Sequence, residues 1–170
     1  MKLQKIKIQK ISIKYLVFLL ASYLLSTLYI GNSTFTFSSL PSILYTLSGG
    51  SIAGAILAFL TFLRSGVYKG VPQIFEARLL IALSIGLGIY LFGLANKKYE
   101  NSNLAVVAIT VVPSMLAFFI IRTFYDYEAA MIMSKTLIVT LALNTLLALI
   151  IDKIIDMPEQ KGVIAKWLKQ

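Results

Sequence analysis

Residues 40–70 read LPSILYTLSGGSIAGAILAFLTFLRSGVYKG, and the interpretation of this stretch decides the fold. It starts as an apolar segment, reaches Gly49-Gly50, and resumes as a run of small and apolar residues that ends at Arg64. A glycine pair weakens a helix, because glycine loses more backbone freedom on folding than any other residue. The stretch is therefore either one membrane span or two helices joined at the glycines.

The composition is typical of an integral membrane protein. Apolar residues make up 58% of the 170 residues, charged residues make up 14%, and the mean hydropathy is +0.84. A soluble domain has no use for so many apolar residues, because water must wet its surface. Several nearly uncharged runs approach the ~20 residues needed to cross a bilayer. These runs lack the alternation of a β-barrel, so we expect an all-α integral membrane protein.

Histidine and cysteine are both absent from the sequence. This excludes disulfides, thiol chemistry, the usual zinc and haem sites, and acid–base catalysis by imidazole. We therefore expect no catalytic residues, no metal site and no cofactor, and we do not expect an enzyme. The net charge of +9 suits contact with anionic lipid, because no motif for binding nucleic acid accompanies it.

The charged residues divide the chain into three parts. Residues 1–14 form a basic juxtamembrane segment, residues 15–151 a single transmembrane helical domain, and residues 152–170 a cytoplasmic amphipathic tail. Within the domain, further spans are expected at about 15–30, 79–95, 104–121 and 129–151. Residues 31–39, GNSTFTFSS, are polar and uncharged, and they suit an outer loop or the start of a short helix.

Charge counting distinguishes five spans from six. With a single span at residues 40–63, the lysine-bearing tail ends on the side opposite the basic N-terminus. With a break at Gly49-Gly50, the two termini share a side that carries eleven lysines, against four basic residues on the other side. Cytoplasmic segments are the ones rich in lysine and arginine. We expect five to six transmembrane helices, favour six, and expect both termini on the cytoplasmic face of the cell membrane.

Small residues recur at a spacing of four in the organising stretch. Gly50, Gly54 and Ala58 fall on one face of a helix, and Gly86 lies in the next span. Small side chains let helix backbones approach closely in a membrane. We therefore predict helix packing at Gly49, Gly50, Gly54, Ala58 and Gly86. The alternative is that the glycine pair exposes backbone groups to a ligand, as discontinuous helices do.

Lys135 lies about two turns inside the last expected span. A charge at that depth is costly unless it is paired or reaches water. Two interpretations stay open. Lys135 either reaches the outer interface along its own stem, or faces a polar cavity and there binds an anionic ligand or pairs with Glu128. Thr136, Thr140 and Asn144 form a separate polar stripe, which suits hydrogen bonds between helices or contact with a ligand.

Basic and aromatic residues gather on the expected outer side, near the ends of the spans. Guanidinium groups suit the recognition of a carboxylate or a phosphate. The alternative is that these residues anchor the helices at the interface and pair with neighbouring carboxylates. The hypothetical ligand-binding set consists of Arg64, Tyr68, Arg78, Arg122, Glu128, Lys135 and Asn144.

The organising stretch resembles the core motif of LYT-type multi-span sensor domains, found in LytS-like histidine kinases and some diguanylate cyclases. A proline, a glycine pair, a small-residue helix, an arginine and a glycine turn follow one another, here as Pro41, Gly49-Gly50, Gly54, Arg64 and Gly70. The last span, with SKTLIVTLALNTLLALI, is also similar to that of the family. The resemblance implies a bacterial signal-transduction sensor that binds a small ligand in an outward-facing cavity.

Two other classes of membrane protein are also similar to this chain. The substrate-binding S-components of energy-coupling-factor vitamin transporters have six helices, this length and cytoplasmic termini. MreD-type cell-shape scaffolds have a similar length and number of spans. The expected partners are a bilayer with anionic lipids, a small-molecule ligand, and a signalling or transport subunit or a second copy of the chain. No nucleic acid is expected.

Overall fold

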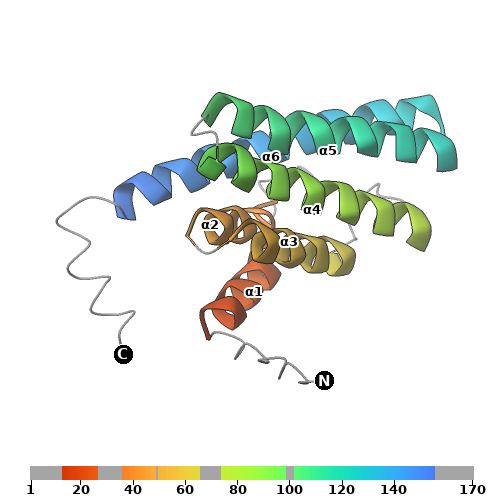
Figure 1. Cartoon of the computed structure of the whole chain (residues 1–170). Coiled ribbons are helices and arrows are strands. Elements are labelled where there is room, and N and C mark those ends of the chain that lie inside the picture. Colours follow the sequence, from red (N-terminus) through yellow and green to blue (C-terminus); the bar gives the residue numbers. More distant parts are fainter. Residues whose placement is uncertain (1–12, 27–35, 49, 66–73, 99–101, 156–170) are drawn as a thin grey trace, which may run out of the picture.

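The computed structural model describes residues 13–26, 36–48, 50–65, 74–98 and 102–155 (Figure 1). The regular structure in these residues is α-helical, which confirms the all-α class expected from the sequence. The six helices are α1 (Ile13–Ser26), α2 (Leu40–Ser48), α3 (Ser51–Ser65), α4 (Phe75–Lys98), α5 (Ser102–Phe124) and α6 (Tyr127–Ile155).

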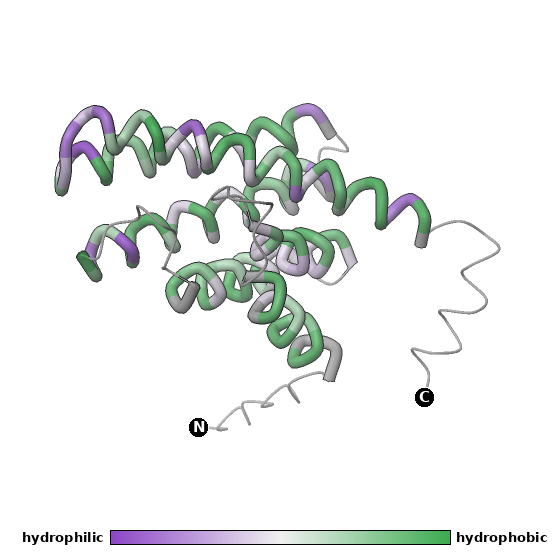
Figure 2. The backbone as a smooth tube through the Cα atoms, turned by 180° about the vertical axis from the view of Figure 1, so that it is seen from behind, coloured by the Kyte–Doolittle hydropathy of each residue, from purple (hydrophilic) through white to green (hydrophobic). Residues whose placement is uncertain are grey.

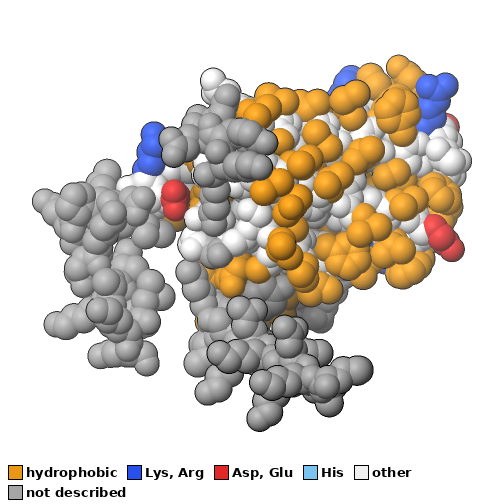
Figure 3. All heavy atoms as spheres, in the orientation of Figure 1, with side chains coloured by type: hydrophobic (Ala, Val, Ile, Leu, Met, Phe, Trp, Pro, Cys, Tyr) orange, Lys and Arg blue, Asp and Glu red, His pale blue; other side chains and the backbone are white. Residues whose placement is uncertain are grey.

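Three of the helices are long and apolar enough to cross a membrane. Their apolar lengths are Phe75–Asn96 in α4, Asn103–Phe124 in α5 and Tyr127–Ile154 in α6, and α3 adds the shorter apolar stretch Ser51–Leu63. Figure 2 shows that hydrophobic residues dominate the middles of these helices and that hydrophilic residues gather near their ends. Hydrophobic side chains also cover much of the surface shown in Figure 3. These features are compatible with an integral membrane protein.

Consecutive long helices run antiparallel: α5 runs opposite to α4, and α6 runs opposite to α5 (Figure 1). The helix α3 packs along α4, and α2 contacts α3, α4 and α6. The first helix, α1, contacts α2 and α3 and runs at a steep angle to the long helices. The short helix α2 is therefore the element that joins α1 and α3 to α6.

The helix break expected at Gly49-Gly50 is present, because α2 ends at Ser48 and α3 begins at Ser51. The helix α2 has nine residues and α4 has 24. At a rise of about 1.5 Å per residue, α2 is roughly 13 Å long and covers less than half of the length of α4.

The position of α2 along α4 follows from two contacts. A Cβ atom at Gly93, near the end of α4, would meet the side chains of Thr46 and Ser51, so the C-terminal end of α2 lies there. Ser39, directly before α2, lines a small pocket together with Ile85 from the middle of α4. The helix α2 therefore begins halfway along the bundle and ends near one end of it.

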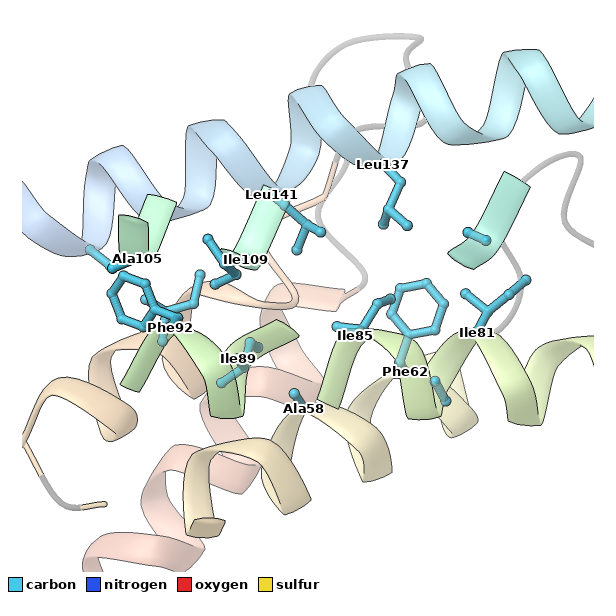
Figure 4. Packing of buried hydrophobic residues seen from close by; sticks show 14 of the residues in the cluster. Ala58, Phe62, Ile81, Ile85, Ile89, Phe92, Ala105, Ile109, Leu137 and Leu141 are labelled. Atoms are coloured by element: carbon cyan, nitrogen blue, oxygen red, sulfur yellow. The ribbon is translucent and has the colours of Figure 1, made fainter. Parts of the chain in front are cut away.

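The core lies between α3, α4, α5 and α6. Figure 4 shows Phe62 of α3 beside Ile81 and Ile85 of α4, with Leu137 and Leu141 of α6 across from them. All five of these side chains are buried. Smaller residues such as Ala58, Ala105 and Ala117 complete the buried cluster and allow the helices to approach closely.

Glycines stand where neighbouring helices leave no room for a side chain. A Cβ atom at Gly54 would meet the Thr46 side chain and lie 2.9 Å from the Ser42 carbonyl oxygen. At Gly86 it would lie 3.2 Å from the Ala55 carbonyl oxygen. At Gly50 it would meet no atom within 4 Å, so no neighbouring helix requires a glycine there. Gly49 lies outside the described residues.

We expect the substitution Gly54→Val to destabilise the protein by about 1–3 kcal/mol, because the added side chain must displace Thr46 or the backbone of α2. Thermal unfolding of the purified protein in detergent measures this loss. The control is Ile52→Val, which places the same side chain on the exposed face of α3. Equal stability of the two variants would contradict the close α2–α3 packing.

Candidate functional site

Most of the residues of the predicted ligand-binding set lie at one end of the bundle. Because α3, α4, α5 and α6 alternate in direction, the C-terminal ends of α3 and α5 meet the N-terminal ends of α4 and α6 (Figure 1). These four ends carry Arg64, Arg78, Arg122 and Glu128. The side chain of Arg64 and the whole of Tyr68 lie outside what the structure describes.

The register of α4 and α5 places Arg78 and Arg122 at the same level. A Cβ atom at Gly88 would meet the ring of Pro113, so these two residues face each other across the antiparallel pair. Arg78 stands ten residues before Gly88, and Thr123 stands ten residues after Pro113. Arg122 is therefore within one residue of the level of Arg78 on the neighbouring helix.

Arg78 is half-buried in the first turn of α4. Its Nε atom is buried and has no hydrogen-bond partner within the described part of the chain. A buried donor without an acceptor costs about 1–3 kcal/mol, and more when the group is charged. The Arg78 guanidinium is thus poised to donate a hydrogen bond to an acceptor from outside these residues.

Arg122 is exposed, and the turn between α5 and α6 fixes its surroundings. Its guanidinium carbon lies 5.8 Å from the centre of the Tyr127 ring, within the range of a cation–π contact. The Tyr127 ring meets Phe118 edge to face at 5.8 Å between ring centres. The Asp126 carboxylate accepts a hydrogen bond of 2.7 Å from the Ala129 N–H and so caps the start of α6.

Glu128 and Lys135 are both exposed on α6. They stand seven residues apart, which corresponds to roughly 10 Å along the helix. A lysine must be exposed to reach an interface along its own stem. The exposure of Lys135 is therefore compatible with the first of its two interpretations. The pocket beside Ser39 includes neither Glu128 nor Lys135.

Asn144 lies apart from this basic end and is buried in the middle of α6, where it is 1% exposed. Its Nδ2 atom donates 2.9 Å hydrogen bonds to the Thr36 carbonyl oxygen and to the Thr140 carbonyl oxygen. Asn144 stands nine residues after Lys135, roughly 13 Å along the helix axis. Asn144 therefore ties α6 to the segment that leads into α2.

This segment was not among the predicted site residues. Thr36, Ser38 and Ser39 are all buried, so residues 36–39 lie inside the bundle directly before α2 instead of in an outer loop. The sequence offers only one signal for this position, a run of hydroxyl residues before an apolar helix. That composition is equally typical of an exposed turn.

In comparisons with known proteins, no family model, no curated protein and no solved structure matches this chain. The part of the chain that the structure describes is all-α, and three of its helices are long and apolar enough to span a membrane. The similarities to sensor domains, S-components and scaffolds stay predictions.

We expect Asn144→Leu to lower the stability by about 1–3 kcal/mol, because the buried hydrogen bond from Asn144 Nδ2 to the Thr36 carbonyl oxygen is then lost. Thermal unfolding in detergent checks this. Thr136→Val on the same helix is the control, since the Thr136 hydroxyl bonds to the Ile132 carbonyl one turn back in its own helix. Its effect should stay within about 0.5 kcal/mol. A loss as small for Asn144→Leu as for the control would contradict the role of Asn144.

Proposed function

We propose that this chain is a multi-pass sensor of the cell membrane that binds a small anionic ligand at its outer end. The chain has six helical elements, and both of its termini lie in the cytoplasm. Support comes from the three membrane-length helices, from the excess of lysines on one side of the predicted topology, and from the resemblance of residues 40–70 to LYT-type sensor domains.

The observation that carries the proposal is the pair Arg78 and Arg122. The two residues stand at the same level of adjacent helices, and the buried Nε of Arg78 has no acceptor among the described residues. A guanidinium group matches the geometry of a carboxylate or a phosphate and binds either through two parallel hydrogen bonds. An anion bound at this end of the bundle would satisfy Arg78, and Arg122 supplies a second positive charge at the same level of the next helix.

Sensing requires that the ligand favour one arrangement of the helices over another. A ligand bound at Arg78 and attracted by Arg122 constrains the ends of α4 and α5, which pack against each other. The expected response is a shift of these ends relative to α3 and α6. A signalling subunit that contacts the cytoplasmic side would detect the shift.

Ligand binding is testable with inorganic phosphate and citrate as probes of the two anion classes. We expect the better probe, at about 100 times its Kd, to raise the melting temperature of the detergent-purified protein by roughly 5–10 °C. Arg78→Gln and Arg122→Gln should each abolish this rise. Lys153→Gln is the matched control, because Lys153 is an exposed cation at the opposite end of α6, and it should keep the rise.

Loss of the rise in all three variants would show a nonspecific effect of charge, and persistence of the rise in Arg78→Gln would exclude Arg78 from the site. No rise with either probe would contradict binding of these two anion classes.

Topology is testable by cysteine labelling, because the natural chain has no cysteine. Tyr125→Cys and Asn103→Cys place a thiol at exposed positions near the two ends of α5. In intact cells we expect an impermeant thiol reagent to label Tyr125→Cys and to leave Asn103→Cys unlabelled until the membrane is opened. Labelling of Asn103→Cys in intact cells would overturn the proposed orientation.

A further inference from the structure

Lys135 is the one charged residue on the outward face of α6 between the two ends of this helix. The side chains of that face alternate in steps of four and three residues, and we name them the α6 stripe: Glu128, Ile132, Lys135, Val139, Ala142 and Leu146. The three large apolar members are exposed, whereas Asn144 is buried on the opposite side of the helix. Lys135 therefore projects away from the bundle, from the centre of an apolar stripe.

The depth of Lys135 follows from two measures that agree. The apolar length of α6 begins at Tyr127, and Lys135 stands eight residues later, roughly 12 Å along the axis. Figure 4 shows Leu137, two residues further on, across from Ile81 and Ile85 in the interior of the apolar length of α4. In a hydrocarbon core about 30 Å thick, this depth is most of the way to the middle.

The stem of Lys135 covers only part of this distance. Side chains of a helix lean towards its N-terminus, which for α6 is the basic end of the bundle. The extended four-carbon stem spans about 6 Å, so the ammonium group stays roughly 6 Å short of the level of Tyr127. An ammonium group at such a depth is costly unless it is paired or reaches water. Lys135 therefore calls for an acidic partner within the membrane.

The sequence itself has no carboxylate at this depth. Its seven acidic residues all stand near or beyond the helix ends, at positions 76, 100, 126, 128, 152, 156 and 159. The nearest one on the α6 stripe is Glu128, roughly 10 Å closer to the basic end. A second copy docked on the same stripe about a two-fold axis would bring its own Lys135 to the same depth. Two like charges there repel each other, so the stripe does not suit self-association.

We propose that the α6 stripe is the docking surface for a membrane-spanning helix of another protein, which carries an Asp or a Glu at the depth of Lys135. Steps of four and three residues form the seam along which two helices pack at about 20°. Ala142, two turns after Lys135, lets the partner backbone approach closely. The inference requires α6 to cross the membrane, and it is independent of the anion site at Arg78.

A synthetic membrane-spanning helix tests the charge complementarity. The probe is a leucine–alanine helix of about 20 residues that carries one Glu about eight residues from one end, and its twin carries Gln at that position. Energy transfer measures association with the full chain in phosphatidylcholine vesicles. The dye on the protein is attached at Asn103→Cys, because the natural chain has no cysteine. We expect the Glu probe to bind roughly tenfold more tightly than the Gln probe.

The variants assign this preference to one side chain. Lys135→Leu should remove it, and Lys135→Glu should make a Lys-bearing probe the tighter one. Lys153→Leu is the matched control, because it removes an exposed lysine near the other end of α6, and it should keep the preference. Equal binding of the Glu and Gln probes, or a preference that survives in Lys135→Leu, would overturn the proposal. So would a preference lost in phosphatidylglycerol vesicles, which would assign Lys135 to a lipid phosphate.

Crosslinking in intact cells tests the natural occupant. A photoreactive amino acid replaces Val139, one turn after Lys135 on the α6 stripe, or Val111 on the exposed face of α5 as the control position. From position 139 we expect an adduct with a membrane helix that contains an Asp or a Glu. Lys135→Arg should keep this adduct and Lys135→Leu should lose it. An adduct only with lipid, with a second copy of the chain, or with a helix that has no carboxylate would contradict the docking surface, as would the same adduct from position 111.

Discussion

The arrangement of this bundle depends on how it satisfies a stretch of non-helical backbone in its interior. Residues 36–39 lie among apolar helices, where an unpaired carbonyl group is costly. Asn144 resolves this, because its side chain donates to the Thr36 carbonyl oxygen from the middle of α6. The helix α2 follows directly, so the same bond fixes where α2 starts and how it sits between α3 and α6. In a bilayer this would be essential, since non-helical backbone at depth is tolerated only inside protein or beside water.

Close packing fixes the other end of α2. Thr46 folds its hydroxyl back onto the Ser42 carbonyl oxygen, and it stands where Cβ atoms at Gly54 of α3 and Gly93 of α4 would otherwise lie. Small residues on two helices thus converge on one threonine of a third helix. This is the packing that small residues allow when there is no hydrophobic driving force between helices in lipid. The glycines at 54 and 93 are therefore explained by their neighbours, whereas Gly50 is explained by its place directly before α3.

The sequence sufficed for the all-α class and the helix break, because these follow from hydropathy and from a glycine pair. For Asn144 it left hydrogen bonds between helices and contact with a ligand both open. It did not reveal that residues 36–39 are buried, since hydroxyl residues before a helix suit a turn equally well. Nor did it reveal the partner of Asn144, which is 108 residues away in the chain. The common level of Arg78 and Arg122 depends on the contact between Gly88 and Pro113, which is a tertiary fact.

The helix α4 reaches from the basic end to α2, which it contacts near its own C-terminal end. It carries Arg78 in its first turn, Ile85 beside the pocket, and Gly93 against Thr46 and Ser51. Arg78 and Gly93 lie roughly 22 Å apart along the axis, a distance over which a helix moves as a rigid unit. Because Gly93 has no free space around it, a shift of α4 towards α2 has to displace the end of α2 or the start of α3. Packed interfaces respond to such a shift by changing between discrete arrangements instead of deforming gradually. A contact route from the proposed anion site at Arg78 to the start of α3 therefore runs through the close contact at Gly93 and requires no chain of polar residues.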